Sequence, residues 1–433
     1  MEQRHQKIAR VKHPFPYRIN LGRLKQYVLA LGNIGRNADD NGIYRIAFSD
    51  ADIEGRRWLM QQMKQAGLIP YMDEVANVFG GFEKDETNQQ PYVLVGSHLD
   101  SVPCGGTLDG ALGVLAGLEC MRIIKEQGLK TKYPIEVVAF SDEEGRFGGM
   151  LGAQAFSGDL TPEDILSKYD VDGHKLTDVM EQQQLMPLAA LEAKRDPDGL
   201  HAYLELHIEQ GPVLERTNNQ IGVVEGIAGL FKWSARLIGA ANHAGATPMD
   251  MRNDAFQGLA DFAHEIPRIL DENGTPLSRA TVGKIDLEPG FPHTIPERAD
   301  FTLVVRDTNK AVLNELHDAF RKALSAIARR RALKFEYDLI SWIDPIDCDP
   351  QLIDCIEQSA VAGKVSYMRM PSGAGHDAQF LHKVMKTGMV FVPSKDGKSH
   401  SPAEWTDWND IEAGANVLLN ALIEVAQPTN QNQ

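Results

Sequence analysis

The stretch PYVLVGSHLDSVPCGGTLDGALGVLAGLECMRIIKEQGLKTKYPIEVVAFSDEEG, residues 91–145, decides the fold class. It contains an apolar strand, a helix and a second apolar strand. In the helix, apolar side chains recur every three residues at Leu112, Leu115, Leu118 and Met121, which gives the helix one apolar stripe. Buried strands that alternate with helices in this way predict an α/β fold with a mostly parallel, doubly wound sheet.

Two later segments also open apolar and end polar. They are AYLELHIEQG at residues 202–211 and GMVFVPS at residues 388–394. We expect both to be strands of the same sheet. In open α/β sheets ligands bind at the carboxyl ends of the strands, so the polar residues at these ends are candidates for a functional site.

The middle of the chain has a different pattern. Alternating strands are predicted at residues 230–240, 279–287, 299–307 and 332–343, and amphipathic helices at residues 254–270 and 310–331. The order β-α-β-β-α-β is typical of a ferredoxin-like α+β unit. We therefore predict a catalytic domain formed by residues 1–225 and 345–433, with a second domain inserted at residues 226–344.

Charge and composition exclude several classes of partner. The 433 residues include 44 Lys and Arg and 60 Asp and Glu, which gives a formal charge of −16. Nucleic acids and anionic membranes require a basic face, so we expect neither as a partner. No run approaches the ~18 apolar residues of a membrane span, and the polar N-terminus lacks a secretory signal. With four scattered cysteines, the expected location is the cytoplasm.

Histidines and carboxylates stand at or just after the ends of the predicted parallel strands. They are His98 in GSHLD, Asp109 in TLDG, Glu143 and Glu144 in SDEEG, His207 in LHIEQG and His400 in KSHSP. A single histidine of this kind is more often structural, but repetition at matching positions favours a metal centre. Two metal ions need one bridging carboxylate, and Asp109 at a helix start is well placed to bridge. His98 with Glu144, or with His207 or His400, can complete the ligand shells.

The adjacent carboxylates Glu143 and Glu144 have separate roles in this interpretation. Neighbouring side chains of an extended segment point in opposite directions, so both rarely bind one metal. One can bind a metal while the other acts as general base toward a metal-activated water. A solvated loop is the alternative for such a pair, but its position directly after an apolar strand favours the functional interpretation.

Four longer strings resemble a known family: GSHLDSVPCGGTLDGALGVLAGLE, FSDEEGRFGGMLGAQAFSG, LELHIEQGPVLE and PSGAGHDAQF. They are similar to the aminoacylase and carboxypeptidase-like dinuclear metallohydrolases. More narrowly, they resemble the branch of N-carbamoyl-L-amino-acid hydrolases, β-ureidopropionase and allantoate amidohydrolases. The similarity extends over nearly the whole chain. It implies hydrolysis of a ureido or amide C–N bond, not a peptide bond, in a small anionic substrate.

The resemblance also implies roles for residues of the catalytic domain. The positions that match two divalent metal ions per subunit are His98, Asp109, Glu144, His207 and His400, with Asp109 bridging. Glu143 matches the general base, and Gln210 matches a substrate-side residue. Zinc, manganese, cobalt or nickel suits such mixed ligands.

In the inserted domain, His243 in NHAGATPMDMR matches a residue that stabilises the developing oxyanion across a homodimer interface. Arg306 matches the arginine that binds the substrate carboxylate. Gly373 to His376 match a loop of the same pocket, and His376 and Asp377 are given a pocket or supporting role instead of ligation. The inserted domain is thus expected to act as a lid and in dimerisation.

One position departs from the family. The family usually has asparagine before an x-Ile-Pro step, and this chain has His293 in FPHTIP. An imidazole there replaces a neutral amide, which puts the substrate's identity in doubt. We hypothesise that His293 and Arg306 together still receive an anionic group.

Two alternatives stay open from the sequence. The first is a dipeptidase or N-acyl amino acid deacylase on the same scaffold. The second is a non-catalytic binding protein with a relic site, which usually has a ligand or the base replaced. Here every such position is filled.

Overall fold

The computed structural model describes residues 15–83 and 89–427. They form two compact units. The first comprises the residues up to Glu225, Cys348–Met370 and the residues from His376 onward, and the second comprises Gly226–Asp347 and Pro371–Gly375. Among the described residues, no helix has both the length and the apolar character needed to cross a membrane.

A nine-stranded sheet runs through the first unit. Its path is β1 (Ile69–Met72), β2 (Val78–Gly81), β4 (Ile135–Phe140), β3 (Tyr92–His98), β5 (Leu200–Ile208), β13 (Lys386–Val392), β6 (Ile221–Ile227) and β11 (Ile346–Asp347), with β12 (Tyr367–Ser372) paired to β6. Strands β4, β3, β5 and β13 are parallel and buried along almost their whole length. This parallel centre confirms the predicted sheet.

The flanks of this sheet are antiparallel. Strands β1 and β2 pair with each other and β2 pairs with β4, while β6 pairs with β13 and β11. These flanking strands were not predicted from the sequence. Strands of two to four residues, such as β1, β2 and β11, are too short for a periodic pattern to stand out.

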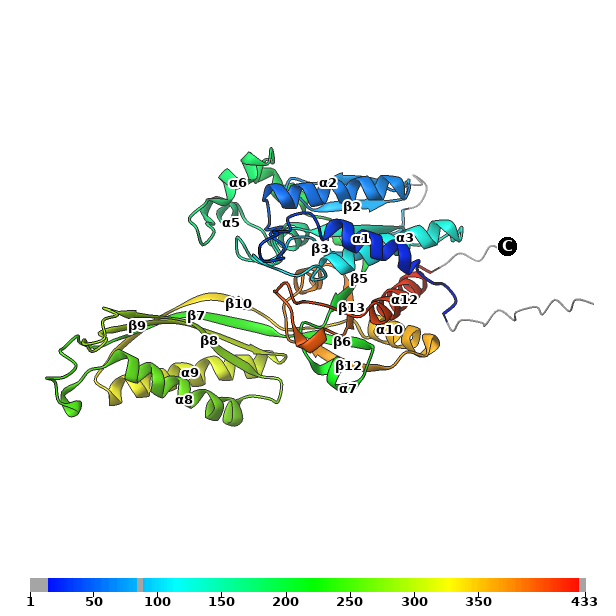
Figure 1. Cartoon of the computed structure of the whole chain (residues 1–433). Helices are drawn as coiled ribbons and strands as arrows, with labels where there is room; N and C mark the ends of the chain where they lie inside the picture. Colours follow the sequence, from blue (N-terminus) through cyan, green and yellow to red (C-terminus); the bar gives the residue numbers. More distant parts are fainter. Residues whose placement is uncertain (1–14, 84–88, 428–433) are drawn as a thin grey trace, which may run out of the picture. The chain divides into compact units, whose positions relative to one another are not determined.

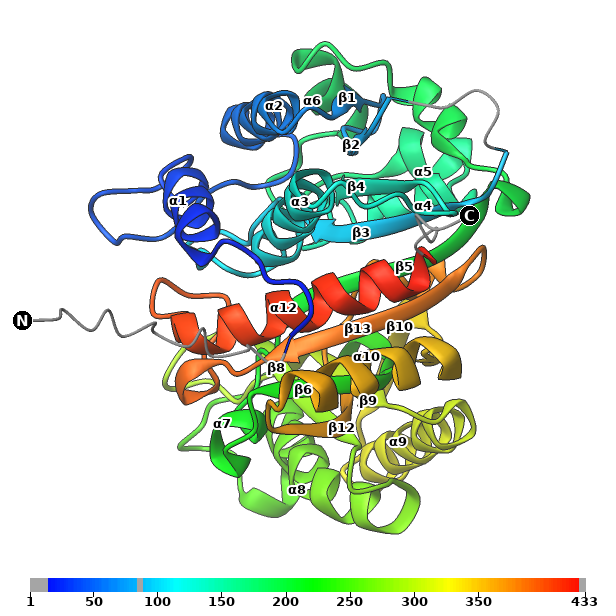
Figure 2. The ribbon, with the colours of Figure 1, turned by 90° about the vertical axis from the view of Figure 1, so that its right-hand side faces the viewer.

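Helices cover the central strands. The helices of the first unit are α1 (Leu21–Leu31), α2 (Asp50–Gln65), α3 (Ala111–Glu126), α4 (Leu151–Ser157), α5 (Pro162–Ser167), α6 (Leu176–Gln182), α7 (Val213–Thr217), α10 (Pro350–Gly363), α11 (Ala378–Leu381) and α12 (Trp408–Val425). Helix α3 packs on β3, β4 and β5, and α12 packs on β5 and β13. Helix α10 runs beside α12 and also contacts β13 (Figure 2).

The second unit has the predicted order of elements. It contains β7 (Gly229–Ile238), α8 (Ala255–Asn273), β8 (Arg279–Glu288), β9 (Arg298–Asp307), α9 (Lys310–Arg330) and β10 (Lys334–Ile343). The four strands form an antiparallel sheet in the order β10-β7-β9-β8, and α8 and α9 lie together on one of its faces (Figure 1). Phe231, Trp233, Phe262, Phe301 and Phe320 form much of the core between them.

The boundaries of the second unit extend slightly beyond the predicted range of 226–344. Strand β11 pairs with the end of β6, and the Ala228 N–H donates to the Ser372 carbonyl at 2.9 Å. These backbone contacts group Ile346–Asp347 and Pro371–Gly375 with the second unit.

A close approach between α3 and β5 sets the position of the residues just before α3. A Cβ atom at Gly113 would lie 2.4 Å from the Leu206 carbonyl oxygen. Only glycine allows this distance, because real side-chain carbons do not come within 3 Å of a backbone oxygen. The first turn of α3, and with it Asp109, is therefore held close to the end of β5.

We expect Gly113→Ala to lower the free energy of unfolding by about 1–3 kcal/mol, because the added methyl group overpacks this contact. Gly199→Ala is the matched control: a Cβ there meets no atom within 4 Å. We expect its effect to stay within about 0.5 kcal/mol. Urea unfolding of the two variants measures the difference, and equal stabilities would contradict the close-approach argument.

Candidate metal centre

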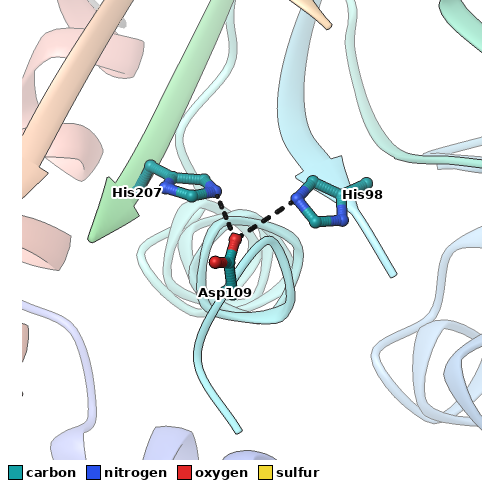
Figure 3. Close-up of side chains that lie close together, drawn as sticks. All are labelled: His98, Asp109 and His207. Atoms are coloured by element: carbon teal, nitrogen blue, oxygen red, sulfur yellow. Dashed lines mark ion pairs between the residues drawn. The ribbon is translucent and has the colours of Figure 1, made fainter. Parts of the chain in front are cut away.

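Three predicted ligands from three separate elements meet at the carboxyl edge of the central strands. His98 ends β3, His207 lies near the end of β5, and Asp109 directly precedes α3. Their side chains point toward one another (Figure 3). His207 Nε2 lies 3.2 Å and His98 Nε2 lies 3.6 Å from Asp109 Oδ1. All three residues are buried.

The other oxygen of Asp109 faces a second group. His400 Nε2 lies 3.4 Å from Asp109 Oδ2 and 3.4 Å from Glu144 Oε2. Ligand atoms of Asp109, Glu144 and His400 lie within 4.8 Å of one another, as do those of His98, Asp109 and His207. The five predicted ligands thus form two triads that share Asp109, one on each of its carboxylate oxygens.

The tautomers of two histidines suit metal binding. His98 Nδ1 lies 3.1 Å from the Asp100 carbonyl oxygen, and His207 Nδ1 lies 2.9 Å from that of Ile208. A carbonyl only accepts, so we assign the proton of each ring to Nδ1. Each Nε2 then presents a lone pair toward Asp109. A cation shared between these Nε2 atoms and Asp109, either a proton or a metal ion, stabilises the cluster, so this donor set fits a metal ion. His207 Nε2 also accepts from the Gly110 N–H at 3.2 Å.

The pKa values of the acids and of His400 in the site also indicate a place for a cation. Burial and the nearby charge of Asp109 raise the pKa of Glu144 to about 7. Burial raises the pKa of Glu143 well above its usual range. Hydrogen bonding with Asp109 raises the pKa of His400 to about 9. The charged forms of the two glutamates are therefore costly in this pocket, and a positive charge beside them, such as a divalent cation, would offset that cost.

Glu143 and Glu144 point toward different partners. Glu143 Oε2 lies 3.7 Å from His98 Nε2, whereas Glu144 Oε2 lies toward His400. Their backbone N–H groups donate to the carboxylate of Asp100, at 3.4 Å from Glu143 and 3.2 Å from Glu144. The two glutamates can therefore serve different roles, and Asp100 holds both in place.

Asp100 is one of three supporting acids that the sequence analysis missed. The Glu404 carboxylate accepts from the N–H groups of Leu108 (2.8 Å) and Asp109 (3.0 Å), which fixes the backbone at the shared carboxylate. Glu205 is buried, accepts from Ser97 Oγ at 2.6 Å, and forms a third cluster with His207 and His376. Asp100 in GSHLD and Glu205 in LELHIEQGPVLE stood inside strings already singled out, which was the available signal, whereas Glu404 lies two residues beyond KSHSP.

Gln210 and His376 also lie at the centre. Gln210 Nε2 donates to Asp109 Oδ2 at 2.7 Å and lies 3.3 Å from His400 Nε2. The His376 ring centroid lies 4.7 Å from that of His207. The neighbouring Asp377 is buried, and neither of its carboxylate oxygens has a hydrogen-bond partner among the described residues. Gln210 and His376 thus both lie next to the candidate metal ligands, Gln210 beside Asp109 and His376 beside His207.

The remaining predicted residues, His243, His293, Arg306 and Gly373, belong to the second unit. The N–H groups of Gly245 and Ala246 both donate to His243 Nδ1 at 3.1 Å, so Nε2 carries the proton of the neutral ring. His293 accepts at its carbonyl from the Ala244 N–H at 2.9 Å. Arg306 Nη1 donates to the Gly373 carbonyl at 3.0 Å. Both histidines are exposed.

Comparison with known proteins identifies the family of this chain. Residues 94–424 match the model of peptidase family M20/M25/M40. An N-carbamoyl-L-amino acid amidohydrolase of Geobacillus stearothermophilus is 39% identical over 94% of this chain and 98% of that protein. The allantoate amidohydrolase of Escherichia coli is 34% identical over 89% of this chain and 93% of that protein.

A solved structure extends the similarity to three dimensions. A hydantoinase/carbamoylase-family amidase of Burkholderia multivorans superimposes with a TM-score of 0.85 at 36% identity, over 95% of this chain and 98% of that chain. The predicted family resemblance and the predicted fold class are therefore confirmed. The chain belongs to peptidase family M20/M25/M40, whose hydrolases depend on metal ions.

Proposed function

We propose that this chain uses water to hydrolyse the ureido C–N bond of a small, anionic N-carbamoyl amino acid or a related ureide. The observation that carries the proposal is the carboxylate of Asp109, shared by two triads of ligand atoms. The relatives named above as amidohydrolases of N-carbamoyl amino acids and of allantoate support the substrate class. Hydrolysis yields the free amino group of the substrate, carbon dioxide and ammonia.

The proposed cofactor is a pair of divalent metal ions. His98, Asp109 and His207 would hold one ion, and Asp109, Glu144 and His400 the other. When bound, two such ions lower the pKa of a water molecule and polarise the scissile carbonyl group. Imidazole and carboxylate ligands suit zinc and also manganese, cobalt or nickel.

Glu143 is the proposed general base. Its carboxylate is buried and lies beside His98, and its backbone is held by Asp100. In this role Glu143 accepts a proton from the attacking water and delivers it to the leaving nitrogen. Asp100 and Glu404 keep Glu143, Glu144 and Asp109 in position through hydrogen bonds with backbone N–H groups.

The second unit would supply the groups that bind and polarise the substrate. With Nδ1 occupied by two N–H donors, His243 offers an Nε2–H to an oxygen that gains negative charge. Arg306 is the proposed partner of the substrate carboxylate, and its contact with the Gly373 carbonyl supports a role for that loop. His293 would act beside Arg306.

A homodimer is part of the proposal. The second unit exposes large apolar side chains at Ile285, Phe291, Leu339 and Ile340, and each exposes at least 49% of its surface. Apolar surface of this kind is typical of a face that binds a second copy. His243 would then act in the active site of the partner subunit.

Removing the base tests the mechanism. We expect Glu143→Gln to lower kcat by roughly 10² to 10⁴, because general-base catalysis is lost while the amide keeps the shape of the side chain. Bound metal, measured by elemental analysis, should be unchanged. The exposed Glu192→Gln is the matched control and should keep wild-type kcat. Wild-type turnover by metal-loaded Glu143→Gln would show that another group is the base.

Metal content tests the two-triad arrangement, and it also distinguishes the proposed enzyme from a binding protein with a relic site, which would hold clearly fewer than two metal ions. Protein purified without chelator should hold about two equivalents of divalent metal per chain. His400→Ala should keep about one, because only one triad loses a ligand, whereas Asp109→Asn should lose most of both. His382→Ala, an exposed histidine, is the control and should keep the wild-type content. Equal losses in His400→Ala and Asp109→Asn would contradict a shared Asp109.

Mixing two inactive variants tests whether His243 acts across a dimer. Glu143→Gln and His243→Ala subunits, unfolded together and refolded, should regain about a quarter of wild-type activity. Half of the dimers would be mixed, and each mixed dimer has one site with both residues intact. Activity that stays at the level of the separate variants would assign His243 to its own subunit.

A further inference from the structure

A cavity of about 340 Å³ opens in the first unit next to the metal-binding cluster. Its lining includes Glu144, one of the candidate ligands, and Asp100, which accepts from the Glu144 N–H. None of the mechanistic steps above uses this space. Its volume lies in the range typical of sites for small ligands, which is roughly 300–1,000 Å³.

Most of the wall surface of the cavity is apolar. Its aliphatic part is formed by Ile46, Ala47, Val102, Pro103 and Val171, from three separate segments of the chain, and polar and charged side chains complete the lining. Val171 is fully exposed, at the tip of the loop between α5 and α6. An apolar ligand group that enters the cavity would cover this exposed side chain and remove it from water, which is favourable.

The loop that carries Val171 is tied to the metal centre through Arg146, which lies two residues after Glu144. Arg146 donates to the Ala47 carbonyl at 2.8 Å and, through Nε, to the Asp170 carboxylate at 3.1 Å. The same carboxylate accepts from the N–H groups of Asp172 (3.0 Å) and His174 (2.8 Å). The wall formed by Val171 is therefore held in a defined position relative to Glu144.

The charges around the cavity select against an acidic ligand group. Asp100, Glu144, Asp170 and Asp172 contribute carboxylates, and the guanidinium group of Arg146 is already bound to Asp170. His174 also lines the cavity, and its Nδ1 lies 3.1 Å from Asp170 Oδ2, so both basic groups already face this carboxylate. An acidic ligand group would therefore meet more carboxylates than unpaired positive charges here. A polar uncharged group would lose hydrogen bonds with water at the aliphatic part of the wall, whereas an apolar group would not.

We propose that this cavity is the subsite for an apolar side chain of the substrate, so that the preferred substrates are N-carbamoyl amino acids with aliphatic or aromatic side chains. The inference rests on the proposed function and narrows its substrate class. Glycine and β-alanine derivatives would leave the cavity unfilled, and allantoate would place a polar group in it.

The test compares kcat/KM for N-carbamoyl-L-leucine and N-carbamoylglycine on the metal-loaded enzyme. The wild type should favour the leucine derivative by about 10-fold or more, as expected for an aliphatic group that enters an apolar pocket. Val171→Asp should reduce this preference at least about 5-fold, because it adds a carboxylate at the rim. Val171→Leu should retain the preference.

Val361→Asp is the matched control, since Val361 is 56% exposed on α10 and does not line the cavity. Its leucine-to-glycine preference should equal that of the wild type. Equal hydrolysis of both substrates by the wild type, or an unchanged preference in Val171→Asp, overturns the subsite while leaving the proposed function intact. If neither N-carbamoyl substrate is hydrolysed, the proposed function fails and the subsite with it.

Discussion

The site depends on one constraint, which is that Asp109 faces two sets of donors at once. One carboxylate oxygen lies near His98 and His207, and the other near His400. Gln210 Nε2 and Ser399 Oγ donate to Asp109 Oδ2, and hydrogen bonding with Asp109 raises the pKa of His400 to about 9. The buried carboxylate is therefore stabilised by positive or donating groups on both sides. A pair of divalent metal ions would take over that role and displace the protons.

The parallel centre of the sheet holds these groups in position. His98 and His207 end neighbouring buried strands, and the packing of α3 through Gly113 brings Asp109 to the same edge. Glu404 then fixes the Asp109 backbone from a segment almost 300 residues later in the chain. Buried apolar strands and helices at a distance from the polar cluster thus form the scaffold that positions the candidate ligands.

The apolar scaffold and the polar contacts at the site differ in how well they could be predicted from the sequence. Strand and helix periodicity, with motifs at strand ends, was sufficient to predict the parallel centre, the order of elements in the second unit and the groups that converge on Asp109. Asp100, Glu205 and Glu404 were missed because their partners are backbone N–H groups or distant hydroxyls. Such contacts depend on the path of loops, which no periodic pattern records. Among the antiparallel flanks, β1, β2 and β11 are too short to carry a pattern, whereas β6 is as long as β3 and its length does not explain why it was missed.

Backbone contacts also explain how one residue type can serve opposite purposes in the two units. His98 and His207 each place Nδ1 against a carbonyl oxygen, so Nε2 is the ring atom that could bind a metal; in His207 it also accepts from the Gly110 N–H at 3.2 Å. His243 places Nδ1 against two N–H groups, so its Nε2 carries a proton and can only donate. The side chains are chemically identical, and the local backbone selects the tautomer. His243 is therefore suited to the proposed stabilisation of an oxyanion and unsuited to bind a metal through Nε2. The backbone would in this way separate the two proposed roles without any change of residue type.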